Sequence, residues 1–171
     1  MLNLFKKVKV SEKDPGISVI PISRVKTAVV FLDTTDTSWM EARKQILDFF
    51  FQHKIIADFY FIDTNTYKKG FGPSTNPEQT LYGEDFNLNE RARTEKVNTL
   101  FSKTPDMIIS LINREHPGTE SILRACNSKY KVGRMAYKKD FFSLIVSDPE
   151  GQAFNQSEAW ETMGKYLKAI I

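Results

Sequence analysis

The sequence predicts a single α/β domain, folded as a three-layer, Rossmann-like sandwich with a mostly parallel sheet. Three short runs of the chain are almost entirely apolar and do not alternate with polar residues: 27–32, 55–62 and 106–112. Strands of this kind are covered on both faces, as they are in parallel sheets. Segments with helical spacing of apolar residues separate the runs, and this alternation of strand and helix is typical of three-layer α/β folds.

Two capping signals locate the first and the last helix. Ser38 and Glu41 have the spacing of a capping box, so we expect a helix that begins at Ser38 and ends near His53. Asn155 and Glu158 repeat the same spacing ahead of the final helix. Both helices carry apolar residues at helical spacing, which predicts one buried face on each.

The middle of the chain contains a long polar connection, 64–89, which either hides a short strand over 80–86 or forms a mobile segment or lid. Two further helices and two further strands are predicted after it: 90–102, 119–127, 131–137 and 141–147. The last two strands are too close in sequence for a parallel crossover. Either they form a hairpin, which gives an antiparallel edge, or the first of them is only a brief extension.

The chain divides into a basic N-terminal arm, 1–26, and one α/β domain, 27–171. Lysines are concentrated in the arm: Lys6, Lys7, Lys9 and Lys13. A second basic group lies near the C-terminal end of the predicted sheet: Lys129, Lys131, Arg134, Lys138 and Lys139. Either group could contact phosphates or a membrane surface, or simply keep the protein in solution. The net charge of +3 argues against a dedicated nucleic-acid-binding protein, but RNA or ribosome binding through the arm stays open.

Several classes of protein do not fit the composition. The single cysteine, Cys126, excludes an internal disulfide and a multi-cysteine metal site, and its place on an apolar helix face predicts a small buried side chain. Two isolated histidines, His53 and His116, cannot fill a zinc site, so we expect no metal. No glycine-rich phosphate loop follows the first strand, and we expect no nucleotide cofactor. Without a signal peptide or an apolar run of about 20 residues, we expect a cytoplasmic protein with no membrane span.

The candidate site lies where ligands bind in open α/β sheets, outside the carboxyl ends of the strands. Three segments follow predicted parallel strands there: 33–38, 63–67 and 113–118. From the first and the third we select candidate ligand-binding residues: Asp33, Thr34, Thr35, Asp36, Ser38, Asn113, Arg114 and His116.

The chemistry of these residues favours a small polar ligand. Free amides at the start of a helix attract an anion, and Arg114 and His116 could supply positive charge from the facing loop. Asp33 and Asp36 oppose a bare phosphate, so a neutral polar ligand or a metal-bridged anion ranks higher. No catalytic constellation is evident, and whether the protein is an enzyme stays open. We therefore expect a non-catalytic or ligand-binding domain; the alternatives are a transferase with an unrecognised site and an RNA- or ribosome-associated protein.

Four segments of the chain resemble a family of small uncharacterised bacterial proteins, each a single domain of unknown function: 27–36, 106–111, 126–133 and 141–146. The resemblance extends from about Arg24 onward and implies no activity. The stretch Ser128–Arg134 is also similar to the amino-terminal, Rossmann-like half of heptosyltransferase-type glycosyltransferases. Those enzymes need a second α/β domain to hold the nucleotide sugar, and this chain has no room for one. This second resemblance therefore implies a relationship in fold and not in activity.

Overall fold

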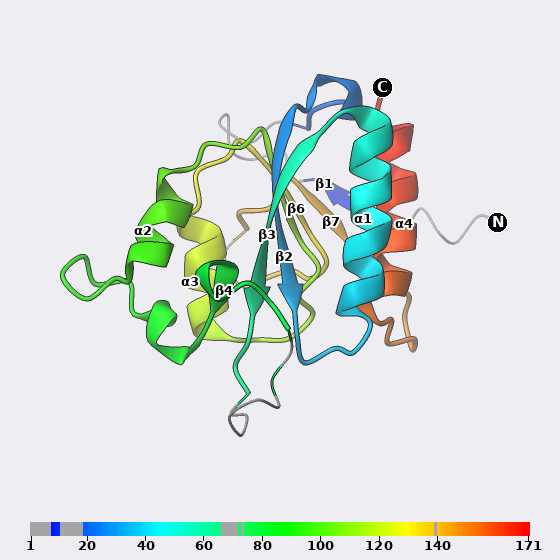
Figure 1. The fold of residues 1–171 in the computed structure, drawn as a ribbon. Helices are drawn as coiled ribbons and strands as arrows, with labels where there is room; N and C mark the ends of the chain where they lie inside the picture. The colour runs from blue at the N-terminus through cyan, green and yellow to red at the C-terminus, as the bar shows by residue number, and fades with distance from the viewer. Residues whose placement is uncertain (1–7, 11–18, 66–71, 73, 139) are drawn as a thin grey trace.

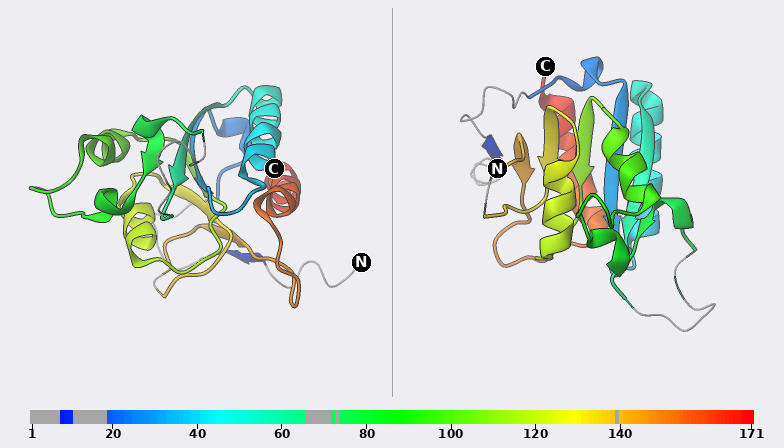
Figure 2. Two further views of the ribbon diagram at one scale, coloured as in Figure 1. Left: turned by 60° about the horizontal axis from the view of Figure 1, so that its bottom comes forward. Right: turned by 90° about the vertical axis from the view of Figure 1, so that its left-hand side faces the viewer.

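The computed structural model describes residues 8–10, 19–65, 72, 74–138 and 140–171. These residues form a three-layer α/β sandwich (Figure 1), so the expected fold class is confirmed. Two helices cover each face of the central sheet, as Figures 1 and 2 show. On one face they are α1 (Trp39–His53) and α4 (Gln156–Ala169), and on the other α2 (Glu95–Ser102) and α3 (Pro117–Ala125).

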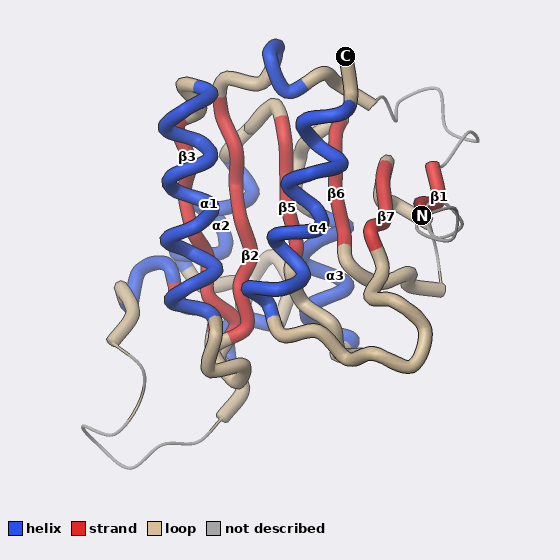
Figure 3. The backbone as a smooth tube through the Cα atoms, turned by 90° about the vertical axis from the view of Figure 1, so that its right-hand side faces the viewer, coloured by secondary structure: helices blue, strands red, loops and turns tan. Residues whose placement is uncertain are grey.

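The sheet has the strand order β1-β7-β6-β5-β2-β3-β4. Figure 3 labels the strands of this order from β1, at one edge of the sheet, to β3. Its strands are β1 (Val8–Val10), β2 (Thr27–Asp33), β3 (Ile56–Ile62), β4 (Thr80–Leu81), β5 (Met107–Ser110), β6 (Tyr130–Gly133) and β7 (Leu144–Val146). After β2 the chain adds β3 and β4 on one side of it. The chain then crosses to the other side of β2 and adds β5, β6 and β7. The direction of winding therefore reverses between β2 and β5, and this switch point is where α/β sheets bind ligands.

The last two strands along the chain, β6 and β7, are parallel to each other, so the hairpin that we considered for them is wrong. Val132 lies opposite Leu144, and Gly133 lies opposite Ile145. The first of these two strands, β6, stops at Gly133, earlier than expected, and the described residues between it and β7, 134–138 and 140–143, contain no helix. The antiparallel edge comes instead from β1, which pairs with β7 and belongs to the segment that we assigned to the arm.

The hydrophobic core is divided between the two faces of the sheet. The side chains that continuous apolar strands predict to be buried are at most 2% exposed: Val30, Phe31, Ile62, Leu111 and Leu144. Cys126 is buried as expected, and burial raises the pKa of its thiol to about 12. Among the described residues, no helix has both the length and the apolar character needed to cross a bilayer.

The two predicted capping boxes have different outcomes. Asn155 and Glu158 form one at the start of α4, with the Asn155 side chain accepting from the Glu158 N–H at 2.9 Å. The box of Ser38 and Glu41 is wrong, because the Ser38 side chain does not cap α1. Ser38 binds Asp36 instead: the Oδ1 of Asp36 accepts from both the N–H and the hydroxyl of Ser38, at 2.9 and 2.7 Å.

The described part of the long connection is held by a buried carboxylate. Only Thr80–Leu81 is a strand, and the rest of the expected strand is a 3-10 helix, Gly83–Phe86. Asp85 is 1% exposed and accepts from the N–H of Tyr82, the hydroxyl of Thr94 and the ammonium of Lys96. Residues 66–71 and 73 of the connection lie outside the described residues. α2 begins at Glu95 and α3 at Pro117, so the expected start of α2 was five residues early and that of α3 two residues late.

Candidate functional site

Asp33 and Arg114 meet at the switch point of the sheet. Asp33 is the last residue of β2, and Arg114 lies in the loop between β5 and α3. The guanidinium binds both carboxylate oxygens, through Nε to Oδ2 and through Nη2 to Oδ1 at 3.2 Å. The N–H and hydroxyl of Thr35 also donate to Oδ1, at 2.9 and 2.7 Å. The carboxylate is buried with its charge compensated, which is how a protein can retain it.

The start of α4 forms a wall of this site that the sequence analysis missed. Gln156, 1% exposed, donates through Nε2 to the carbonyl of Asp33 at 2.7 Å and accepts from the Asp33 N–H at 2.8 Å. Asp36 accepts from the Gln156 N–H at 2.7 Å, and the Ser38 hydroxyl accepts from the Ser157 N–H at 3.2 Å. The loop after β2 therefore caps α4, a helix more than a hundred residues further along the chain.

A second buried ion pair borders the site. Arg134 is 3% exposed, and its Nε and Nη2 each lie 2.8 Å from a carboxylate oxygen of Asp148. Its Nη1 donates to the carbonyl of Leu111 at 3.2 Å, at the end of β5. The side-chain amide of Asn113 donates to the same Asp148 carboxylate at 3.1 Å. The pair thus joins the loops that follow β5, β6 and β7.

These contacts enclose a cavity of about 180 Å³ at the carboxyl ends of β2 and β5. Five of the eight candidate residues line it: Asp33, Thr35, Asp36, Asn113 and Arg114. The rest of its wall comes from residues that we had not selected: Leu111, Arg134, Phe154 and Gln156. Two carboxylates and two guanidinium groups are therefore among the lining side chains, and their formal charges cancel.

The three other candidate residues support the surrounding elements and do not line the cavity. The N–H and hydroxyl of Thr34 both donate to the carbonyl of Ile62, at 3.1 and 3.2 Å. Ser38 caps α4, as described above. His116 is the N-cap of α3: its Nδ1 accepts from the Thr119 N–H at 3.2 Å, and its ring packs against Phe86 at 4.7 Å.

Two titratable groups beside the ion pair have shifted pKa values. Burial, with Arg114 nearby, lowers the pKa of His116 below 6.5, although Asp33 opposes the shift. Burial and the Asp33 carboxylate raise the pKa of Asp63, which follows β3 and is 3% exposed. Both shifts favour the uncharged form, so the surroundings of the ion pair disfavour added charge. In the part of the chain that the structure describes, no three His, Cys, Asp or Glu side chains gather where they could hold a metal ion.

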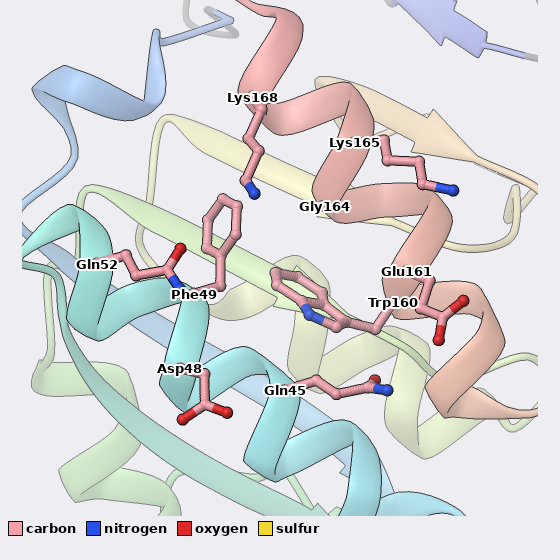
Figure 4. Close-up of a pocket in the computed structure, with 9 residues that line it drawn as sticks. All are labelled: Gln45, Asp48, Phe49, Gln52, Trp160, Glu161, Gly164, Lys165 and Lys168. Atoms are coloured by element: carbon pink, nitrogen blue, oxygen red, sulfur yellow. The ribbon is translucent and has the colours of Figure 1, made fainter.

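A larger cavity of about 400 Å³ lies between α1 and α4, away from the switch point (Figure 4). Phe49 and Trp160 meet edge to face along it with ring centroids 5.3 Å apart, and each is less than 10% exposed. The ammonium of Lys168 lies over the Phe49 ring, 5.4 Å from its centroid. This groove therefore lies where the aromatic residues of α1 and α4 pack, and all of its lining residues belong to these two helices.

The fold and this site define the class of the protein: a Rossmann-like α/β domain with a small polar cavity at the switch point of its sheet. Residues 3–170 match the model of a protein family described as a family of unknown function (DUF6913). The chain belongs to this family, as the first of the two resemblances led us to expect. Neither the curated proteins nor the solved structures yield a match. The similarity to heptosyltransferase-type enzymes and the bacterial origin stay predictions.

Proposed function

We propose that this protein is a binding domain for a small, polar ligand without net charge, held at the carboxyl ends of β2 and β5. The observation that carries the proposal is the charge balance of the cavity, in which Asp33 and Asp36 face Arg114 and Arg134. At about 180 Å³ it is smaller than the pockets of roughly 300–1,000 Å³ that hold drug-sized ligands, so the ligand has only a few heavy atoms.

The pairing of the charges favours a neutral ligand over an ion. Asp33 already compensates Arg114, and Asp148 compensates Arg134. The remaining carboxylate of the lining, Asp36, accepts from the N–H and hydroxyl of Ser38 and from the Gln156 N–H. A bare anion would lose its hydration shell and meet only guanidinium groups that are already paired, and a cation would find the Asp36 oxygens already hydrogen-bonded. The exposed Thr35 and Asn113 provide a hydroxyl and an amide at the wall of the cavity, groups that suit a ligand with hydroxyl or amide functions.

Binding without chemistry is the interpretation that fits the reactive side chains best. The carboxylate of Asp33 is engaged by an arginine, and the Nδ1 of His116 accepts a backbone hydrogen bond. Cys126 is buried, and its raised pKa keeps it a thiol at neutral pH. We therefore expect no cofactor, and the transferase alternative rests on the distant heptosyltransferase similarity alone.

The RNA-binding alternative depends on the basic residues of the two groups. Some of them are buried and cannot reach RNA, and others lie outside the described residues. Lys131 is 7% exposed, and its ammonium donates to the carbonyls of Leu123 and Arg124 at the end of α3. Arg134 is held by Asp148, and Lys6, Lys7, Lys13 and Lys139 lie outside the described residues. We also propose a cytoplasmic location, because the one cysteine is free and buried.

A thermal-shift screen tests the proposal. The panel contains small neutral polyols, amides and sugars, with inorganic phosphate, nucleotides and nucleotide sugars for comparison. We expect a neutral compound to raise the Tm, and Asn113→Ala to weaken its binding about ten-fold through the loss of one hydrogen bond to the ligand. Asn127→Ala, an exposed asparagine beside the amino end of β6, is the matched control and should leave binding unchanged. Stabilisation by phosphate or nucleotide sugars alone, or unchanged affinity in Asn113→Ala, would reject the proposal.

A further inference from the structure

The sheet has an open edge along the amino-terminal half of β3. On its inner side β3 pairs with β2 over its full length. On its outer side the two-residue strand β4 lies opposite Phe61 and Ile62 only. Among the described residues, no strand pairs with Ala57–Tyr60 on this outer side.

The outward backbone groups of this edge belong to Ala57 and Phe59. The N–H of Ile56 donates to the Lys26 carbonyl on the β2 side, and the N–H of Asp63 donates to the Leu81 carbonyl on the β4 side. Because residues of a parallel strand alternate between their two neighbours, Ala57 and Phe59 turn their N–H and C=O groups outward. Among the described residues these four groups have no hydrogen-bond partner.

A cavity lies beside this edge on each face of the sheet. The first, about 390 Å³, is bounded by α1, by β3 and by the segment ahead of β4: Trp39, Arg43, Leu47, Ala57, Asp58, Phe59, Phe61, Ser74, Thr75, Asn76 and Gln79. The second, about 350 Å³, lies between β2, β3 and the segment after α2, and Ile56 and Asp58 line it. Side chains of an extended strand point alternately to the two faces, so one strand laid along β3 could use both cavities.

The side chains around the edge indicate the chemistry of its occupant. Leu47 of α1 is 39% exposed and Ile56 of β3 is 77% exposed, one on each side of the edge. The guanidinium of Arg43 lies over the Phe59 ring, 5.3 Å from its centroid, and has no ion-pair partner among the described residues. The carboxylate of Asp58 is already bound by Lys103 at 2.8 Å. The surroundings therefore suit apolar side chains together with one acidic side chain.

We propose that this edge binds an extended peptide segment of a partner protein, which adds a strand in line with β4. Its backbone pairs with Ala57 and Phe59, its alternate side chains enter the two cavities, and an acidic side chain reaches Arg43. Strand addition of this kind draws affinity from the backbone and specificity from the pockets. A second copy of β3 fits less well, because its one carboxylate, Asp58, is held by its own Lys103.

The test selects a displayed library of random decapeptides against the full chain and measures the selected peptides by fluorescence polarisation. We expect peptides with alternating apolar residues and an acidic residue. Ala57→Pro removes one outward donor and leaves the ladder to β2 intact, so it should weaken binding about ten-fold or more. Arg43→Glu, which does not alter the backbone, should abolish binding of the acidic peptides. Met40→Asp, on α1 but outside the cavity, should bind as the wild type does.

Three outcomes would overturn the proposal. The library could yield no peptide enriched above an Ala57→Pro bait. The selected peptides could bind the Ala57→Pro and Arg43→Glu variants as well as they bind the wild type. Sedimentation could show a wild-type dimer that Ala57→Pro dissociates, which would make a second copy the occupant. In support of the proposal, a bound peptide should slow hydrogen exchange at the amides of Ala57 and Phe59.

Discussion

At the scale of single residues, the roles that follow from sheet topology could be predicted, and those that depend on distant partners could not. Asp33 and Arg114 were selected because the carboxyl ends of parallel strands meet at one edge, and they form an ion pair there. The role of Ser38 in a capping box was wrong, because the spacing of Ser38 and Glu41 does not reveal that the Ser38 hydroxyl donates to Asp36. Gln156 was missed because nothing local to it predicts a contact with the end of β2.

His116 should make stability depend on pH. Its pKa is lowered from 6.5 in the folded state, so the unfolded chain takes up the proton first as the pH falls. This contribution to stability is complete above pH 6.5 and is lost as the pH falls through the lower folded-state value. His116→Asn keeps a side-chain acceptor at the N-cap and does not titrate. Urea unfolding across this range should show the wild type losing stability relative to His116→Asn; parallel curves would contradict the assignment.

Gly133 should not tolerate a side chain. A Cβ there would lie 2.4 Å from Cε2 of Phe142, whose ring is 3% exposed within the core. We expect Gly133→Ala to lower the free energy of unfolding by about 1–3 kcal/mol through overpacking. Gly83→Ala is the control, because a Cβ at Gly83 would meet nothing within 4 Å, and it should stay within about 0.5 kcal/mol of wild type. Equal stability of the two variants in urea would show that the crossover does not pack on β6 as described.

At the scale of elements, apolar periodicity located the helices, while their ends were set by contacts that periodicity does not record. The first three amides of α4 donate to Asp36, Ser38 and Asn155, and only Asn155 could be identified from its spacing. The strand expected over 131–137 ends at Gly133, where the ring of Phe142 fills the space that a side chain would take. α4 is therefore both a helix of the outer layer and a wall of the site.

Gln156 should be the side chain that joins α4 to the end of β2. Its removal leaves the buried N–H of Asp33 without a partner and leaves the Asp33 carbonyl with the Asp36 N–H alone, at 3.3 Å. We expect Gln156→Ala to lower the free energy of unfolding by about 1–3 kcal/mol, the cost of one unpaired buried group. Gln152→Ala, an exposed glutamine in the preceding loop, should change it by less than about 0.5 kcal/mol. Chemical denaturation compares the two, and a small loss in Gln156→Ala would show that water replaces the side chain.

At the scale of the whole molecule, the fold class could be predicted because the buried strands read as continuous apolar runs. The pairing of the strands at the β1 edge of the sheet could not be predicted. The described residues of the crossover, 134–138 and 140–143, contain no helix, so the rule that parallel strands need a long connection pointed to a hairpin or to a brief extension. Residues 8–10 join the sheet beside β7, although their lysine-rich neighbourhood suggested an arm. The crossover begins at Arg134, which lines the cavity at the switch point, whereas β1 lies at the far edge of the sheet. That a ligand binds at the switch point stays a prediction.

The most direct test of the central claim is a nuclear magnetic resonance titration with the neutral compound that most raises the Tm. The account predicts that the amides of Asp33, Thr35 and Asn113 and the Nε–H of Arg114 shift together with one dissociation constant, because all four residues line one cavity. Resonances of the groove between α1 and α4, such as the Trp160 indole N–H, should stay in place. Shifts confined to that groove, or no shift at the four residues at saturation, would contradict the claim that the switch point is the binding site.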